Sequence, residues 1–266
     1  MNSVVLQAVY GRRWLIGITS IGLMLFSMFI AGLYPILSEL RPSNPIIENM
    51  PVLFESFLGE LSYLREFPTF IASQLFTIHL PLVLGIVAVA YGRSMSVAAE
   101  RRGEFRTLLA QPVSRVGLVM RYWSALVVML AICMVCITLG LYATLPFIEG
   151  DTTIAFSTLM SLVGMLWLYA CTIATITFAI GIATGQGILA VLAGCAVTIF
   201  SHSVTIFSPV LPIIVGYRPY SLLEYVAAVT VAQYGVALSH IVIFLGVSLA
   251  TMIVATITFH VRDISH

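Results

Sequence analysis

Six segments of this 266-residue chain are long, apolar and free of Asp, Glu and Arg, at residues 14–37, 70–91, 123–145, 154–183, 188–207 and 237–259. A helix rises about 1.5 Å per residue, so about 20 such residues cross a hydrocarbon core about 30 Å thick. Barrel strands would alternate in polarity and would be only about ten residues long. The sequence therefore predicts an all-α, polytopic membrane protein with six transmembrane helices in a single domain over residues 1–266.

The composition supports a lipid environment. Only 9% of the residues are charged, whereas about a quarter are charged in a typical soluble domain. The first apolar segment is longer than that of a signal peptide and has no small-residue cleavage site, so we expect it to be retained as the first span. The lipid bilayer is the expected surrounding, and no nucleic-acid partner is expected.

All twelve basic residues are Arg, and the chain has no Lys. A P-loop needs a Lys to reach the outer phosphates of a nucleotide, so this chain cannot carry that ATPase site. If ATP drives the protein, another subunit must bind it. No H-E-x-x-H or G-x-S-x-G pattern occurs either, so we expect no catalytic activity on this chain.

The distribution of Arg predicts the orientation. With six spans and both termini on one side, nine of the twelve Arg residues lie on that side, and Arg41, Arg65 and Arg218 lie on the other. Because cytoplasmic loops are enriched in Arg and Lys, the sequence predicts a multi-pass protein of the cell membrane with both termini in the cytoplasm.

The loop between the second and third predicted spans is the most charged part of the chain, with six Arg residues between Arg93 and Arg121. Val97, Phe105 and two leucines lie near one side of a helix expected over about residues 95–110. Pro112 would end that helix, and Ser114 could cap the next one. Without further information, a loop lying on anionic lipid is an equally good interpretation.

Two external segments have their own pattern. Apolar residues at helical spacing between positions 53 and 64 predict an amphipathic helix on the outer surface. Prolines interrupt the apolar stretch 208–236, which favours a re-entrant hairpin or short outer-leaflet helices over a seventh span. Pro81 is expected to kink the second span.

The charged loop contains the pattern Glu100-x-x-Gly103-x-Phe105-x-x-Leu108-Leu109-x-x-Pro112-Val113-Ser114-Arg115. It resembles the signature of type-2 ABC transporter permeases, which follows the second of their six spans. Phe67-Pro68 before the second span and the ending 259–264 resemble the same family, so the resemblance covers nearly the whole chain. Glu104 and Phe105 stand where the family usually has Thr-Leu.

The resemblance implies that the chain is the transmembrane permease subunit of an ATP-binding cassette exporter. The helix at about 95–110 would be a cytoplasmic coupling helix that docks on a separate ABC ATPase subunit, which would hold ATP and Mg. A second permease subunit, identical or homologous, would complete the pore. The expected docking residues are Glu100, Arg101, Arg102, Gly103, Phe105, Arg106, Leu108, Leu109, Pro112 and Arg115. Phe105, Leu108 and Leu109 would supply the apolar contact, with the charged residues at its rim.

Other functions have less support. A secondary transporter normally needs ionisable groups at membrane depth, and the six segments contain no carboxylate. A structural or force-transmitting subunit that moves no substrate remains the alternative. Cys133-x-x-Cys136 has soft ligands that suit Cu(I), although cysteines at this spacing also pack in apolar helices, and we expect no metal site and no cofactor on this chain.

Overall fold

The computed structural model describes all residues except 1, 39–62, 64–65, 111–112, 149–151 and 263–266. The described residues form helices and connecting turns, and no β-strand occurs among them. Six helical segments in this part of the chain are long and apolar enough to cross a membrane. The predicted all-α fold with six candidate spans is therefore confirmed. The external amphipathic helix predicted from residues 53–64 falls almost entirely outside the described residues.

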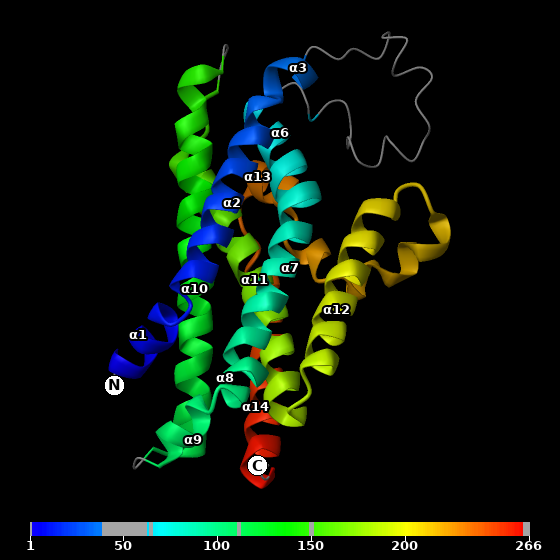
Figure 1. Cartoon of the computed structure of the whole chain (residues 1–266). Coiled ribbons are helices and arrows are strands. Elements are labelled where there is room, and N and C mark those ends of the chain that lie inside the picture. The colour runs from blue at the N-terminus through cyan, green and yellow to red at the C-terminus, as the bar shows by residue number, and fades with distance from the viewer. Residues whose placement is uncertain (1, 39–62, 64–65, 111–112, 149–151, 263–266) are drawn as a thin grey trace.

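The spans run side by side in a bundle (Figure 1). Helix α1 (Asn2–Tyr10) precedes the first span, which consists of α2 (Arg13–Gly32) and α3 (Tyr34–Ser38). The second span consists of α6 (Phe67–Phe70), the π-helix η2 (Ile71–His79) and α7 (Leu80–Met95). The third span is α10 (Arg115–Thr144), which the short 3-10 helix η3 (Leu145–Phe147) extends. The fourth is α11 (Phe156–Thr184), the fifth is α12 (Gly187–Phe207) and the sixth is α14 (Leu238–Val261).

Helix α10 begins eight residues before the predicted third span, which starts at residue 123. Ser114 is its N-cap, because its hydroxyl accepts a hydrogen bond from the backbone N–H of Gly117 at 3.1 Å. The predicted boundary was set by the last charge before the apolar segment, at Arg121. A helix can continue past such a charge into water, so the absence of charge indicates the lipid-facing length and not the end of the helix.

The second span contains a π-helix directly before Pro81. Proline has no backbone N–H and its ring crowds the preceding turn, so the usual hydrogen bond to the carbonyl four residues earlier is lost. The backbone N–H of Leu80, the residue before this proline, donates to the carbonyl of Leu75, five residues back. The hydroxyl of Thr77 likewise donates to the carbonyl of Ala72 at 2.9 Å. The irregularity expected at Pro81 thus takes the form of wider turns.

Helix α11 lies at the centre of the bundle and packs against α7, α10, α12 and α14. Close contact with α7 depends on Gly92, where a Cβ atom would lie 2.6 Å from the carbonyl oxygen of Ala174. Gly181 of α11 lies similarly close to the side chain of Ser96, and Gly194 of α12 lies against Thr177. Small residues therefore allow these helices to approach closely.

The stretch after α12 consists of short elements, namely the 3-10 helices η4 (Pro212–Tyr220) and η5 (Leu223–Tyr225) and the helix α13 (Ala228–Tyr234). Ser221 fixes this stretch to α12, because its hydroxyl donates to the carbonyl of Ser201 at 2.9 Å. The backbone N–H of Leu222 also donates to the hydroxyl of Ser201 at 3.2 Å. No element here is long enough to cross a membrane, which confirms the prediction that this stretch is not a seventh span.

Candidate functional site

Two short helices connect the second and third spans at the end of the bundle where α1 and the end of α14 also lie (Figure 1). They are α8 (Val97–Arg101) and α9 (Glu104–Leu109). Gly103 separates them with a φ of +75°, a conformation that costs a residue with a Cβ about 1–2 kcal/mol. The single helix expected over residues 95–110 is therefore wrong in this detail, because the chain turns at Gly103.

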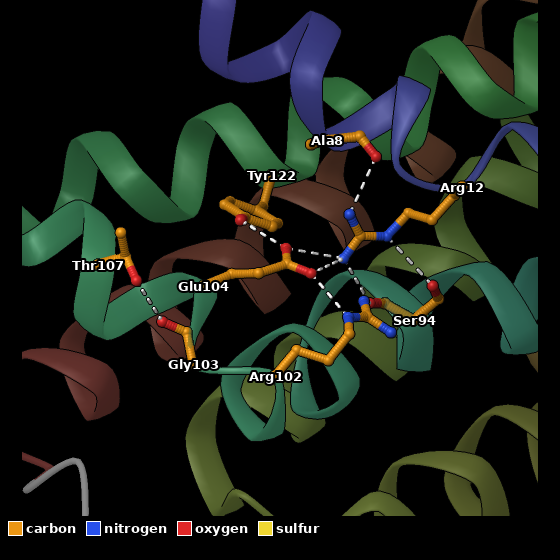
Figure 2. Close-up of polar contacts among 8 residues, drawn as sticks. All are labelled: Ala8, Arg12, Ser94, Arg102, Gly103, Glu104, Thr107 and Tyr122. Carbon is orange, nitrogen blue, oxygen red and sulfur yellow. Dashed lines mark hydrogen bonds and ion pairs between the residues drawn. The ribbon is translucent and has the colours of Figure 1, made fainter.

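Glu104, the first residue of α9, accepts hydrogen bonds from three side chains (Figure 2). A guanidinium nitrogen of Arg12 lies 3.0 Å from its Oε2, and the Nε of Arg102 lies 2.7 Å from its Oε1. The hydroxyl of Tyr122 donates to Oε2 at 2.8 Å. These contacts join α9 to the start of the first span and to α10.

Arg12 is the buried member of this group, with 7% of its surface exposed. Besides Glu104, it donates to the carbonyl of Ala8 at 2.9 Å and to the carbonyl of Ser94 at 3.1 Å (Figure 2). Its Nε also donates to the hydroxyl of Ser94 at 3.3 Å. One guanidinium group therefore holds together α1, the end of α7 and α9, as the five donors of Arg allow.

The environment of Glu104 stabilises its ionised form. Burial alone would raise the pKa of this carboxyl, but the hydrogen bonds from Arg102, Tyr122 and Arg12 outweigh burial and hold the pKa below its ordinary value. The carboxylate is therefore charged at neutral pH, and the contact between α9 and Arg12 is an ion pair.

A second ion pair joins α8 to the segment that follows the last span. A guanidinium nitrogen of Arg262 lies 2.7 Å from the Oε1 of Glu100. The other guanidinium nitrogen donates to the carbonyl of Ile182 near the end of α11, also at 2.7 Å. Gly185 leaves room for this guanidinium, because a Cβ there would lie 2.7 Å from the Cζ of Arg262. Arg262 thus links α8, the end of α11 and the end of α14.

Arg115 binds the same end of α14 from the start of α10. Its guanidinium donates to the carbonyl of Phe259 at 3.1 Å and to the carbonyl of Arg262 at 2.8 Å. A cation near the carboxyl end of a helix satisfies free carbonyl groups and interacts favourably with the helix dipole. Arg115 therefore helps to position Arg262, and through it Glu100.

The structure places Phe105 in the interior of the protein, with only 1% of its surface exposed. Its ring packs edge-on against Tyr122 at 5.0 Å and against Phe259 at 6.1 Å between ring centroids. In this conformation the ring cannot supply the apolar surface that we expected it to present to a partner. Its buried position instead fixes α9 against α10 and α14.

The other expected docking residues are distributed over both faces of α8 and α9. Arg101, Arg102 and Arg106 are exposed, and Leu108 is partly buried against the core. Leu109 lies in the last turn of α9. Pro112 is outside the described residues. The structure thus brings the charged docking residues to one end of the bundle, where Arg101, Arg102 and Arg106 are exposed and Glu100 and Arg115 are partly buried.

The sequence pattern missed Arg12, Tyr122 and Arg262 as members of this site, and it treated Glu104 only as a departure from the family signature. A signal was present, because an acidic residue at an unusual position requires a positive partner. Nothing in the local spacing identifies that partner, since Arg12 is 92 residues from Glu104 and Arg262 is 162 residues from Glu100.

Cys133 of α10 is part of the helix packing, and Cys136 is only partly buried. The Sγ of Cys133 lies 3.3 Å from the hydroxyl of Tyr91 and 3.5 Å from that of Ser20, and Cys133 is buried. Among the described residues, no three His, Cys, Asp or Glu side chains gather in a way that could hold a metal ion. The two hydroxyl contacts place Cys133 in the packed interior of the bundle.

Comparison with protein-family models, with curated proteins and with solved structures found no match for this chain. The case for a function therefore depends on the arrangement of the residues described above.

Proposed function

We propose that this chain is the permease subunit of an ATP-binding cassette exporter, and that a separate ABC ATPase docks on α8 and α9. The observation that carries the proposal is that ion pairs join both short helices to residues next to the first and last spans of the chain. Glu104 binds Arg12 at the start of the first span, and Glu100 binds Arg262 after the last one. Movement of α8 and α9 would therefore be transmitted directly to both spans.

The surface available for docking is basic. Arg101 and Arg106 are exposed on α8 and α9. A cavity of about 340 Å³ lies between α1, α9 and α10, with Arg102 and Glu104 in its wall. Gln7, Thr107 and Leu108 are among its lining residues. A partner segment with an apolar side chain and flanking carboxylates would match this surface, since complementary charge guides association and sets the register.

The proposed partner binds ATP and Mg, so that this chain needs no nucleotide site and no cofactor of its own. The bundle would sit in the cell membrane with α8, α9 and both termini in the cytoplasm, where an ATPase and ATP are present. A second permease subunit, identical or homologous, would complete the pathway. Exposed apolar side chains on α2, α12 and α14 provide surface for lipid and for such a subunit.

Co-purification with the ATPase tests the docking surface. Arg101→Glu with Arg106→Glu should reduce recovery of the ATPase about tenfold or more, because like charges placed across an interface are strongly unfavourable. Arg13→Glu with Arg121→Glu is the matched control, since it makes the same change of charge outside α8 and α9. Equal recovery with both double variants would remove α8 and α9 from the interface.

Transport is tested separately in liposomes that contain the complete complex. An exporter should move an amphipathic compound across the bilayer when ATP is added. An active ATPase without movement of any compound offered would instead favour the alternative, a subunit that transmits force without carrying a substrate.

A further inference from the structure

An open groove of about 440 Å³ lies where the end of the second span meets the start of α12. Arg93, from α7, and Arg101, from α8, line one side. Gly187, Ile188, Val191 and Leu192, all from the first turns of α12, line the other. The side with the two arginines is the basic wall and the side formed by α12 is the apolar wall, although the surface of the groove itself is mostly apolar.

The two arginines are free to bind a ligand. Both are exposed, and within the described part of the chain neither has a hydrogen bond or an ion pair. None of the described residues that line the groove is acidic. By contrast, Arg12 and Arg262 at the same end of the bundle are both paired with glutamates. The basic wall thus has uncompensated positive charge.

The side chains of the apolar wall are also exposed. Ile188 is 76% exposed and Leu192 is 59% exposed, although both belong to a helix that is apolar enough to cross a membrane. The groove lies at the end of that span, which is the depth at which phospholipid headgroups meet acyl chains. Arginine side chains at such positions extend toward the headgroups while their aliphatic parts follow the apolar surface.

The geometry points to a binding site for one anionic phospholipid, with its phosphate on Arg93 and Arg101 and an acyl chain along Ile188 and Leu192. Arginine forms paired, charge-assisted hydrogen bonds with phosphate oxygens. Inorganic phosphate could satisfy the arginines but would leave the apolar wall exposed. An acidic partner segment docked on α8 could pair with Arg101 but would leave the apolar wall on α12 exposed. An anionic lipid satisfies both walls at once.

Binding of added lipid to the delipidated, detergent-purified chain tests the site, and native mass spectrometry counts the lipids bound. Phosphatidylglycerol should occupy the wild type at least about fivefold more than phosphatidylcholine with the same acyl chains. Arg93→Gln with Arg101→Gln should remove most of this preference. Arg13→Gln with Arg121→Gln, which removes the same charge elsewhere, should retain it.

Equal occupancy by the two lipids, or equal loss in the two double variants, would overturn the proposal in favour of general attraction to a basic surface. Displacement of the lipid by millimolar inorganic phosphate would show a free-anion site instead. No ATPase is present, so the result is independent of the docking proposal.

Cross-linking on the unmodified chain gives a second test that no folding defect can affect. Phosphatidylglycerol with a photoreactive group near its headgroup should label peptides from residues 93–101 and 187–192 in vesicles. The corresponding phosphatidylcholine should label these peptides several-fold less. Labelling spread evenly over all helix ends, or identical for the two lipids, would refute the site.

Discussion

The ion pair between Glu100 and Arg262 should make a large contribution to stability. Its side chains are 13% and 18% exposed, respectively. Arg262→Gln removes the ion pair and weakens the bond to the carbonyl of Ile182, and it leaves a nearly buried carboxylate without its counter-charge. Removing one partner of a buried pair lowers the free energy of unfolding by about 3–5 kcal/mol. Because both side chains here keep some exposure, we expect a loss of about 3 kcal/mol.

A double-mutant cycle separates the pair from its surroundings. Glu100→Gln should cost less than Arg262→Gln, about 1–2 kcal/mol, because the guanidinium keeps its bond to Ile182. The double variant should be more stable than the sum of the single changes predicts, by a coupling of about 1–3 kcal/mol.

The assay is the apparent unfolding midpoint of the purified protein in detergent. A loss of about 3 kcal/mol should lower the midpoint by about 6–12 °C. Arg218→Gln is the control, since it breaks the Arg218–Glu224 pair, in which Arg218 is 48% exposed, and should cost no more than about 1 kcal/mol. If Arg262→Gln lowered the midpoint no more than this control, or if the cycle showed no coupling, the pair would not hold α8 in place.

Three further results are expected. Because the pKa of Glu104 is lowered in the folded protein, its stabilising contacts are fully present above the ordinary glutamate pKa and are lost as pH falls through the folded value. The wild type should therefore be more stable than Glu104→Gln at neutral pH, and calorimetry or fluorescence should show this difference vanish in acid. Gly92→Ala should cost about 1–3 kcal/mol by overpacking against Ala174, whereas Gly164→Ala, with open space around it, should be neutral or stabilising in the same unfolding assay. After replacement of the native cysteines, an impermeant thiol reagent applied to intact cells should label a cysteine at position 213 and not one at 103 or 186, and labelling at 103 would reverse the orientation.

The spans could be predicted from the sequence because the lipid core imposes a length and excludes charge. Both constraints are local, so they are visible in segments such as 154–183 and 188–207, which match α11 and α12 within a few residues. Helix α10 begins before the predicted span because a helix also forms in water, and the N-cap expected at Ser114 marks that start.

The candidate site was only partly predictable, because its main contacts join residues far apart in the chain. The apolar spacing around Phe105 suggested a face for a partner, yet the same spacing is produced by a helix that packs on its own protein. The contacts of the Phe105 ring with Tyr122 and Phe259 show that this face packs on the protein itself. These contacts depend on how the spans pack, which the local sequence does not reveal. The turn at Gly103 was missed because a glycine within a short helix pattern gives no sign of its φ angle.

The position of Arg262 after the sixth span has a consequence for biosynthesis. The ribosome makes Glu100 long before Arg262. The ion pair of Glu100 can therefore form only after all six spans have been synthesised and the last one has entered the membrane. Any nascent or truncated chain that ends before this arginine leaves the buried carboxylate of Glu100 without its counter-charge. The surface formed by α8 and α9 is therefore completed last, so unfinished chains would not present the proposed docking surface in its final form.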